Sequence, residues 1–402
     1  MLNEHLSGWR RPEILLMVMA AAWGLSTATW MALINNFAVE RAAFDGADMG
    51  ILQSAREIPG FLAFTFVALL VVMREQTIAV VSLLLLGGGV VATGLFPNFF
   101  GLMVTTMIMS VGFHYHETAS QSLALQWSNR DSAPELLGRM LAATSFASIL
   151  AFVLMWAGLR WLDLDFTIIY AIGGGATIVA ALIVQRAFPR MAVDSNQRRE
   201  LFLRRRYWLF YLLTFINGAR RQIFVVFAVF LMVEKFGLSA ENLIVLLLIN
   251  HLINTFLAPK IGRFITRFGE RRALTLEYIG LIGVFVSYAL VENVWFASGL
   301  YILDHLFFAM AIALRTYFGK IADPRDIAAT SGISFSINHI AAVVVPAAFG
   351  FIWLFNPSAV FYAAAGLALV SLALSRLIPH NPDQGNEIAW PGRAVARPAP
   401  AE

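Results

Sequence analysis

The chain has 402 residues, of which 59% are hydrophobic and only 13% carry a charge. A soluble domain usually carries about 25% charged residues, so this composition is typical of a protein surrounded mostly by hydrocarbon. The formal net charge of +4 then indicates basic loops beside a membrane, and we expect no nucleic acid as a partner. Cysteine is absent, which excludes disulfides, thiolate metal sites and thiol nucleophiles.

Twelve apolar runs are each long enough to cross a bilayer as a helix, which requires about 20 residues. The first run is too long for a signal peptide and ends without a small-residue cleavage pattern, so we interpret it as a span. The sequence therefore predicts an all-α membrane protein with twelve transmembrane helices. In chain order the runs cover residues 12–39, 49–73, 77–95, 99–127, 138–160, 166–187, 207–235, 241–262, 273–292, 295–318, 328–354 and 358–378.

Basic residues are distributed unevenly between the two alternating sets of loops. If both termini lie inside, the inner loops and tails hold 22 of the 29 Lys and Arg residues, the outer loops hold three, and four lie within spans. Positively charged loops stay on the cytoplasmic side, so we expect both termini to be cytoplasmic. The outer loops are short and include no long segment suited to glycosylation, which agrees with a bacterial inner membrane.

The longest inner loop divides the twelve spans into two groups of six. We expect an N-terminal six-helix bundle at 1–187, a basic cytoplasmic linker at 188–206 and a C-terminal six-helix bundle at 207–378. Residues 379–402 are rich in Pro, Ala and Gly, and we expect a disordered cytoplasmic tail. Short similarities at an offset of about 190 residues indicate that the two bundles are pseudo-symmetric repeats.

The loop between the eighth and ninth runs resembles the signature G-x-x-x-D-R-x-G-x-R-R of the major facilitator superfamily. Thr266 replaces the acidic residue of that signature. We expect Gly262 to let two helices approach closely and Gly269 to permit a tight reversal, with the arginines near helix carbonyls or lipid headgroups. In that family the loop helps to latch the state that is closed on the inside, so the resemblance implies a gating loop. The matching residues are Gly262, Arg267, Gly269, Arg271 and Arg272.

The resemblance implies the fold of that superfamily, in which two pseudo-symmetric six-helix bundles enclose a site near the bilayer midplane. It covers all twelve spans by their layout, but it does not reach a subfamily. The loop at 73–76 departs from the signature, and the fifth run lacks the glycine-proline motif of drug/proton antiporters. The fold and layout therefore predict a secondary active transporter that works by alternating access.

Ionisable residues within the spans are candidates for the transport site, because charge inside a bilayer is costly and usually functional. Carboxylates and imidazoles can also load and release protons. For each residue the alternative is a structural hydrogen bond or ion pair between helices. We select His114, Glu117, Asn217, Arg220, Arg221 and His339 for substrate binding. We select Glu57, Glu117, Asp304 and His305 for proton coupling.

Arg220 and Arg221 are adjacent in the seventh run, and neighbouring helical residues diverge by about 100°. One of them can therefore face a cavity while the other contacts a neighbouring helix. An arginine in a cavity suits a carboxylate or phosphate, which it can bind with two hydrogen bonds. The alternative is a structural ion pair with Glu57, Glu117 or Asp304.

His114 and Glu117 share one face of the fourth run, whereas His116 points about 200° away from His114. The two histidines cannot easily ligate one metal ion, and we expect no metal site and no cofactor. At the repeat offset His114 falls opposite Asp304, which supports paired roles in the two halves.

These features predict a proton-coupled transporter of a small, anionic organic solute, acting as a monomer in the lipid bilayer. One alternative is an exporter of cationic or neutral drug-like compounds, in which the carboxylates face the cavity and the arginines are structural. Another is a membrane sensor without transport. An intramembrane enzyme is not expected, because the sequence offers no convincing nucleophile with its base and no metal triad on facing helices.

Overall fold

The computed structural model describes residues 11–127, 133–188, 204–323 and 326–389. Within these ranges the chain is almost entirely helical, and only an isolated bridge between Asp383 and Asn386 has β geometry. In chain order the helices are α1 (Pro12–Ala42), α2 (Gly46–Phe61), η2 (Leu62–Thr65), α3 (Phe66–Val72), α4 (Glu75–Thr93), α5 (Phe99–Trp127), α6 (Ala133–Leu162), α7 (Phe166–Ala187), η3 (Arg205–Tyr207), α8 (Trp208–Ile223), η4 (Phe224–Ala228), α9 (Val229–Glu234), α10 (Ala240–Phe268), α11 (Glu270–Leu290), α12 (Val294–Ala309), α13 (Ile312–Ile321), α14 (Ile327–Phe355) and α15 (Pro357–Ser375).

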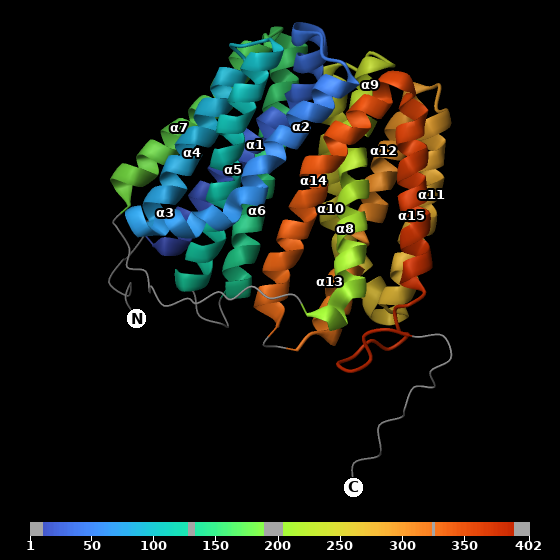
Figure 1. Ribbon diagram of the computed structural model, residues 1–402. Helices are drawn as coiled ribbons and strands as arrows, with labels where there is room; N and C mark the ends of the chain where they lie inside the picture. The colour runs from blue at the N-terminus through green and yellow to red at the C-terminus, as the bar shows by residue number, and fades with distance from the viewer. Residues whose placement is uncertain (1–10, 128–132, 189–203, 324–325, 390–402) are drawn as a thin grey trace.

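These helices form twelve rods that run side by side (Figure 1). Three rods contain more than one helical segment, because the helix is locally distorted rather than interrupted; one of them consists of α12 and α13. In the second rod Pro59 removes a backbone donor, and the 3₁₀ turn η2 follows. A π-helical stretch, η4, joins α8 to α9. Nine of the described helical segments are long and apolar enough to cross a membrane by those two criteria alone, and α10 contains a shorter apolar helix. The predicted twelve-helix layout is confirmed.

The contacts between rods fall into two groups (Figure 1). The first half comprises α1 to α7, in which α4 packs on α5 and α7, and α1 packs on α6. The second half comprises α8 to α15, in which α11 packs on α15, and α8 packs on α14. The halves meet mainly where α2 packs along α14, and also where α6 meets α10. The predicted linker at 188–206 lies mostly outside the described residues, so its boundaries stay predictions.

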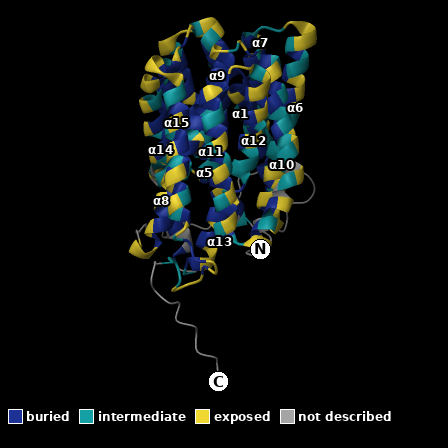
Figure 2. Cartoon of the chain, turned by 90° about the vertical axis from the view of Figure 1, so that its right-hand side faces the viewer, coloured by how far each residue is buried: buried dark blue, intermediate teal, exposed yellow. Residues whose placement is uncertain are grey.

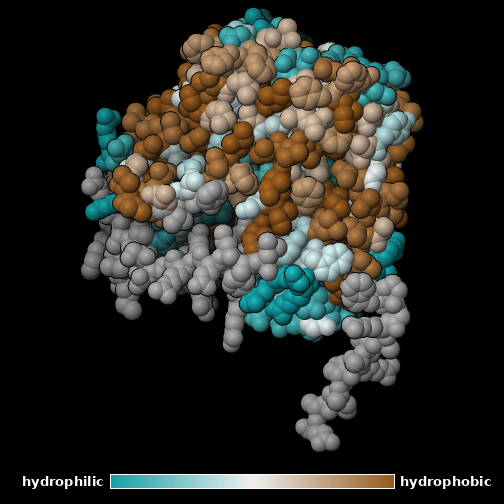
Figure 3. Space-filling model, viewed as in Figure 1, coloured by the Kyte–Doolittle hydropathy of each residue, from teal (hydrophilic) through white to brown (hydrophobic). Residues whose placement is uncertain are grey.

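Apolar side chains cover the outside of the described bundle. Buried residues lie along the inner faces of the rods in Figure 2, while large hydrophobic side chains such as Trp161, Trp295 and Phe355 are exposed. The hydrophobic surface extends over the middle of the molecule in Figure 3, and hydrophilic residues gather towards both ends. Contiguous exposed apolar surface of this extent is typical of a protein that faces lipid.

Glycines bring α4 and α7 into direct backbone contact. A Cβ atom added at Gly174 would lie 2.4 Å from the carbonyl oxygen of Gly87, and one added at Gly87 would lie 2.6 Å from that of Gly174. A Cβ at the neighbouring Gly175 would meet no atom within 4 Å. Close packing of α4 on α7 therefore depends on Gly87 and Gly174, which face each other across the contact.

Hydrogen bonds and ion pairs join separate segments of the chain at each end of the bundle. Because the number of rods is even, α1 begins and α15 ends at one end, here called the terminal end. At the opposite end Asn36 donates a hydrogen bond across the halves to the backbone oxygen of Leu238, at 2.8 Å. At the terminal end the buried carboxylate of Asp326 accepts hydrogen bonds from Arg206 at 2.6 Å and Tyr207 at 3.1 Å, which ties the start of α14 to the segment before α8.

Residues 379–389 differ from the expected disordered tail, because they fold back against the second half. The Gln384 side chain donates to the backbone oxygen of Ala322 at 3.0 Å, and the Tyr317 hydroxyl donates to that of Glu387 at 2.5 Å. Ile388 packs on the apolar cluster around Tyr317, which offsets the cost of ordering this segment. The other residues of the expected tail, 390–402, lie outside the described part of the chain.

The contact between α4 and α7 predicts different outcomes for two adjacent glycines. Gly174→Ala should lower the yield of folded protein and its melting temperature, because a methyl group would overlap backbone that cannot move cheaply. Gly175→Ala should leave both unchanged or slightly improved, since alanine favours a helix over glycine by roughly 1 kcal/mol. Thermal unfolding of both variants in detergent measures the difference, and equal melting temperatures would contradict the packing.

The environment of Asp326 predicts a pH-dependent effect. Burial alone would raise the pKa of Asp326, but hydrogen bonds from Arg206 and Tyr207 and the charge of Arg204 hold the pKa below the ordinary value of 3.8. The ionised carboxylate therefore stabilises the fold above about pH 4, and this contribution is lost as the pH falls through the lowered pKa. Asp326→Asn should reduce the melting temperature by roughly 2–4 °C at pH 7 and by less at pH 3, where part of the contribution of the charge is lost.

Glu135→Gln provides the control, because Glu135 forms an exposed ion pair with Arg139 on one helix, and such pairs contribute little. Its melting temperature should match that of the wild type at both pH values. A deficit in Asp326→Asn that did not change with pH would show that the carboxylate charge is not what stabilises this end.

Candidate functional site

The structure separates the predicted site residues into different environments. One set lies where α2, α5 and α8 meet α14, and we call it the interface cluster. A second set is buried within the second half, and we call it the buried triad. The interface cluster consists of Arg56, Glu57, His114, Glu117, Arg221 and His339. The buried triad consists of Arg220, Glu277 and Asp304.

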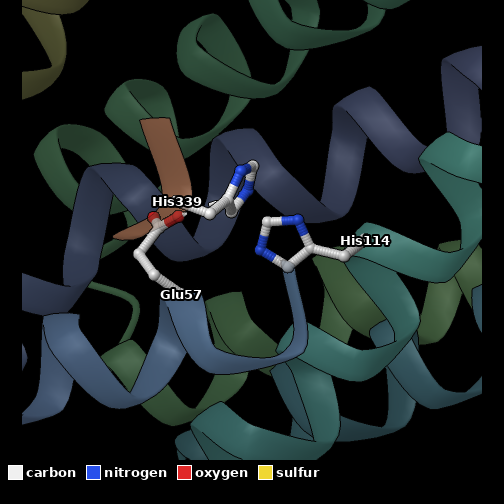
Figure 4. Close-up of side chains that lie close together, drawn as sticks. All are labelled: Glu57, His114 and His339. Atoms are coloured by element: carbon white, nitrogen blue, oxygen red, sulfur yellow. Dashed lines mark ion pairs between the residues drawn. The ribbon is translucent and has the colours of Figure 1, made fainter. Parts of the chain in front are cut away.

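Three side chains from distant parts of the sequence meet at the centre of the interface cluster (Figure 4). Glu57 of α2 forms an ion pair with Arg56 through one carboxylate oxygen, and its other oxygen lies 3.7 Å from Nε2 of His339 on α14. The His339 ring packs at a centroid distance of 5.2 Å from that of His114 on α5. Glu57 and His114 belong to the first half and His339 to the second, so this group spans the boundary between them.

Gly60 makes room for the two imidazole rings on the surface of α2. A Cβ atom at this position would lie 2.2 Å from the His339 ring and 2.7 Å from the His114 ring. No larger residue fits here unless both rings move away from Glu57. The absence of a side chain at Gly60 therefore allows α5 and α14 to approach α2 this closely.

Arg221 and Glu117 extend the interface cluster. Arg221 is exposed, although it lies well inside a rod and its neighbour Arg220 is completely buried. Electrostatic interactions join Arg221 to Glu57 and Glu117 of the first half and to Arg315 of α13, which is also exposed. Charged groups from both halves therefore surround Arg221, as expected if its side chain points between the halves.

Arg220 occupies a different environment from the one selected for it. Its guanidinium lies 3.5 Å from Glu277 of α11 and 4.7 Å from the centroid of the Tyr278 ring. Asn217, also selected for substrate binding, accepts a hydrogen bond from Arg220 at 3.2 Å. All three members of the buried triad are 0% exposed. The structural ion pair considered as the alternative is therefore what the structure contains, with Glu277 as the partner.

Glu277 was not among the residues predicted from the sequence, although a glutamate within the ninth apolar run was a visible signal. It lies early in α11, seven residues after Glu270, whereas most of the predicted site residues lie near the midpoints of their runs. Asp304 completes the triad through its electrostatic interaction with Arg220. Neither oxygen of Asp304 has a hydrogen-bond partner among the described residues.

His305 has different partners from its neighbour Asp304 on α12, and the proton-coupling role predicted for the two stays a prediction. Nδ1 of His305 lies 2.9 Å from the backbone oxygen of Tyr301 and 3.1 Å from the Asn250 amide of α10. His116 likewise points away from the interface cluster, and its ring contacts the backbone oxygen of Ala79 at 3.1 Å. Both histidines therefore make contacts between helices of a single half.

Comparison with known proteins identifies the family. The model described as Major Facilitator Superfamily matches residues 14–346, which is most of the chain. The chain belongs to the major facilitator superfamily. The protein is thus a multi-pass membrane transporter, and the expected resemblance is confirmed.

Solved structures of superfamily transporters share its fold. A mutant of the nucleoside transporter NupG has 13% sequence identity and a TM-score of 0.76, with 91% of this chain and 99% of that chain covered. A bacterial homolog of the human lysosomal transporter Spinster, in an inward-facing and occupied conformation, has 14% identity and a TM-score of 0.77, with coverages of 96% and 100%. These identities support the fold alone. No curated protein matches the sequence.

The signature loop of this superfamily member is only partly as expected. Gly269 adopts a φ of +84° between α10 and α11, so the predicted tight reversal is confirmed. The close approach expected at Gly262 is wrong, because a Cβ there would meet no atom within 4 Å. The Thr266 hydroxyl donates to the Gly262 backbone oxygen at 3.1 Å within α10. The gating role of Arg267, Arg271 and Arg272 stays a prediction.

The transporter halves are packed tightly over only part of their length. Near the opposite end, a Cβ at Gly46 would lie 2.1 Å from the Trp353 ring, and the Ala347 amide donates to Ser54 at 2.8 Å. Glu57 and His339 make the next contact towards the terminal end. Beyond it, Phe61 of α2 and Phe335 of α14 are exposed. Among the described residues, the interface cluster thus lies where the closed part of the α2–α14 contact ends.

The two arginines in α8 predict opposite results for the same substitution. Arg220→Met would leave two buried carboxylates without their cation, and breaking such a pair costs about 3–5 kcal/mol. Arg221→Met should change stability by no more than about 0.5 kcal/mol, because Arg221 is exposed. Thermal unfolding of the purified variants measures both effects. Similar losses in the two variants would argue against the buried triad.

Proposed function

We propose that the protein is a proton-coupled secondary transporter of a small organic anion, with its substrate site at the interface cluster. The observation that carries this proposal is the exposure of Arg221 among charged groups of both halves. An accessible guanidinium can bind a carboxylate or phosphate with two parallel hydrogen bonds. A site built from both halves is also what alternating access requires, because the substrate must contact each half in turn.

The balance of charge around Arg221 favours an anionic substrate. Three arginines, Arg56, Arg221 and Arg315, accompany two glutamates, Glu57 and Glu117. Glu57 is already paired with Arg56, so the surplus positive charge belongs to the exposed arginines. An exporter of cationic compounds would need accessible carboxylates without cationic partners. Glu117 is the other carboxylate of the cluster, and Arg221 interacts with it.

The cross-half contacts support a state that is open at the terminal end. Contacts such as Ser54–Ala347 close the opposite end, whereas α2 and α14 expose apolar side chains near the terminal end. The basic loops predicted to be cytoplasmic lie at the terminal end as well. With cytoplasmic termini in a bacterial inner membrane, this arrangement corresponds to an inward-facing state of a monomeric transporter.

Charge counting in the buried triad supports proton coupling. One guanidinium can neutralise one of the two carboxylates, and leaving the second ionised in a completely buried site would cost several kcal/mol. Glu277 and Asp304 together therefore form a site that can hold one proton. Motion of α8 links this site to the interface cluster, because Arg220 and Arg221 are adjacent in that helix.

Counterflow into proteoliposomes tests the proposal. Labelled carboxylates and organic phosphates form one panel, and the lipophilic cation tetraphenylphosphonium represents the alternative. We expect exchange of at least one anion, and loss of that exchange by more than about tenfold in Arg221→Ala, with partial recovery in Arg221→Lys because lysine keeps the charge without the bidentate geometry. Exchange of the cation only, insensitive to Arg221, would overturn the proposal.

The same vesicles test proton coupling. An imposed pH gradient should drive uptake of the exchanged anion in the wild type, whereas Asp304→Asn should retain exchange and lose the gradient-driven component. Folded yield and elution volume of the variants provide the control for stability. Uptake driven equally well in Asp304→Asn would leave the anion site intact and remove the buried triad from the coupling mechanism.

A further inference from the structure

We propose that Glu57, His114 and His339 form a binding site for a divalent transition-metal ion, and that Zn²⁺ suits it best. One potential ligand atom from each residue lies within 4.8 Å of those from the other two. The three residues belong to the interface cluster, but metal binding by them does not depend on the proposed transport of an organic anion. The site links α2 and α5 of the first half to α14 of the second (Figure 4). The sequence predicted no metal site, because His114 and its close neighbour His116 point in different directions from one helix, and no local pattern places Glu57 and His339 beside His114.

The types of donor determine which ion fits. Two imidazoles and one carboxylate are the protein ligands of many zinc sites, in which a water or another small ligand takes the fourth position. Mg²⁺ and Ca²⁺ prefer oxygen ligands throughout, so an imidazole pair disfavours them. Glu57 and His114 are buried, and the side chain of His339 is 12% exposed, which limits competition from bulk water.

The geometry of His339 prepares one of its nitrogens for a metal. Its Nδ1 donates a hydrogen bond to the backbone oxygen of Phe335 at 2.9 Å, so the lone pair is on Nε2. A ligating histidine commonly has its other nitrogen held in this way. Nε2 lies 3.7 Å from Oε2 of Glu57, which is too long for a hydrogen bond. Two ligands on a tetrahedral zinc ion are roughly 3.3 Å apart, so this pair must approach by a few tenths of an ångström. The three ligand atoms lie within 4.8 Å of one another, so the remaining approach has to come from rotation of the side chains.

Arg56 orients one ligand of the proposed metal site, and its charge also opposes metal binding. Its ion pair uses Oε1 of Glu57, which orients the carboxylate and leaves Oε2 towards His339. Its positive charge, together with that of Arg221, opposes the approach of a dication. Removing the charge of Arg56 should therefore strengthen metal binding, whereas removing a ligand should weaken it. This opposite response distinguishes coordination from a general loss of structure.

A metal ion in this position would bind residues of both halves and hold the halves together. Its ligands come from both halves at the point where the tightly packed part of the α2–α14 contact ends. Separation of the halves at this depth would pull His339 away from Glu57 and His114. A bound ion therefore stabilises the arrangement seen here and opposes opening towards the opposite end.

Calorimetric titration of the full-length, tag-free protein in detergent with ZnCl₂ tests the site. We expect one binding event in the wild type and a loss of affinity of at least roughly tenfold in His339→Ala and in Glu57→Gln. Arg56→Met should bind more tightly than the wild type. His380→Ala is the matched control, because His380 is exposed and distant in sequence from the site, and its affinity should not change.

A second measurement reports the coordination itself. Co²⁺ in a tetrahedral site with imidazole ligands absorbs visible light much more strongly than the hydrated ion, so the wild type should develop this absorption and His114→Ala should not. Helical circular dichroism and elution volume verify that each variant is folded. Absence of Zn²⁺ binding in the wild type would overturn the proposal, as would an unchanged, wild-type Zn²⁺ affinity in the folded His114→Ala and His339→Ala variants.

Discussion

Charge that lies within an apolar bundle must either be neutralised there or be placed where water reaches it, and this constraint arranges the interior of the transporter. The two neighbouring arginines of α8 show both solutions. Arg220 is completely buried and has carboxylate partners within its own half, whereas Arg221 is exposed between the halves. The backbone obeys the same constraint, since a chain surrounded by hydrocarbon must satisfy its own hydrogen bonds, and helices do so within one segment.

Much of the fold could be predicted because its signals are local. The length of each apolar run determines where a helix crosses the membrane. Because the number of crossings is even, the first helix begins and the last helix ends on the same side. The distortions at Pro59 and in η4 do not change that layout. The error at Gly262 has a physical reason: a glycine permits close packing, but only the position of the neighbouring helix decides whether packing occurs there, as at Gly174.

The site was less predictable, because its contacts join residues that are far apart in the sequence. Helical periodicity correctly implied that Arg220 and Arg221 have different surroundings, but it could not assign which of them is buried. The partner of Arg220 is Glu277, on a helix whose neighbours no local pattern reveals. The meeting of His339 with Glu57 depends on packing between α14 and α2, and on the absence of a side chain at Gly60.

The folded segment after α15 has a practical consequence for handling the protein. Gln384 binds the backbone oxygen of Ala322, directly after α13, and so supplies from a distant part of the chain the kind of partner that a helix end lacks. Ala389 also donates to the backbone oxygen of Leu377 at 2.7 Å, which closes the segment into a loop. Affinity tags and fluorescent fusions are therefore best attached after residue 389. A fusion that replaced the chain directly after α15 would remove the contacts of residues 379–389 with the second half.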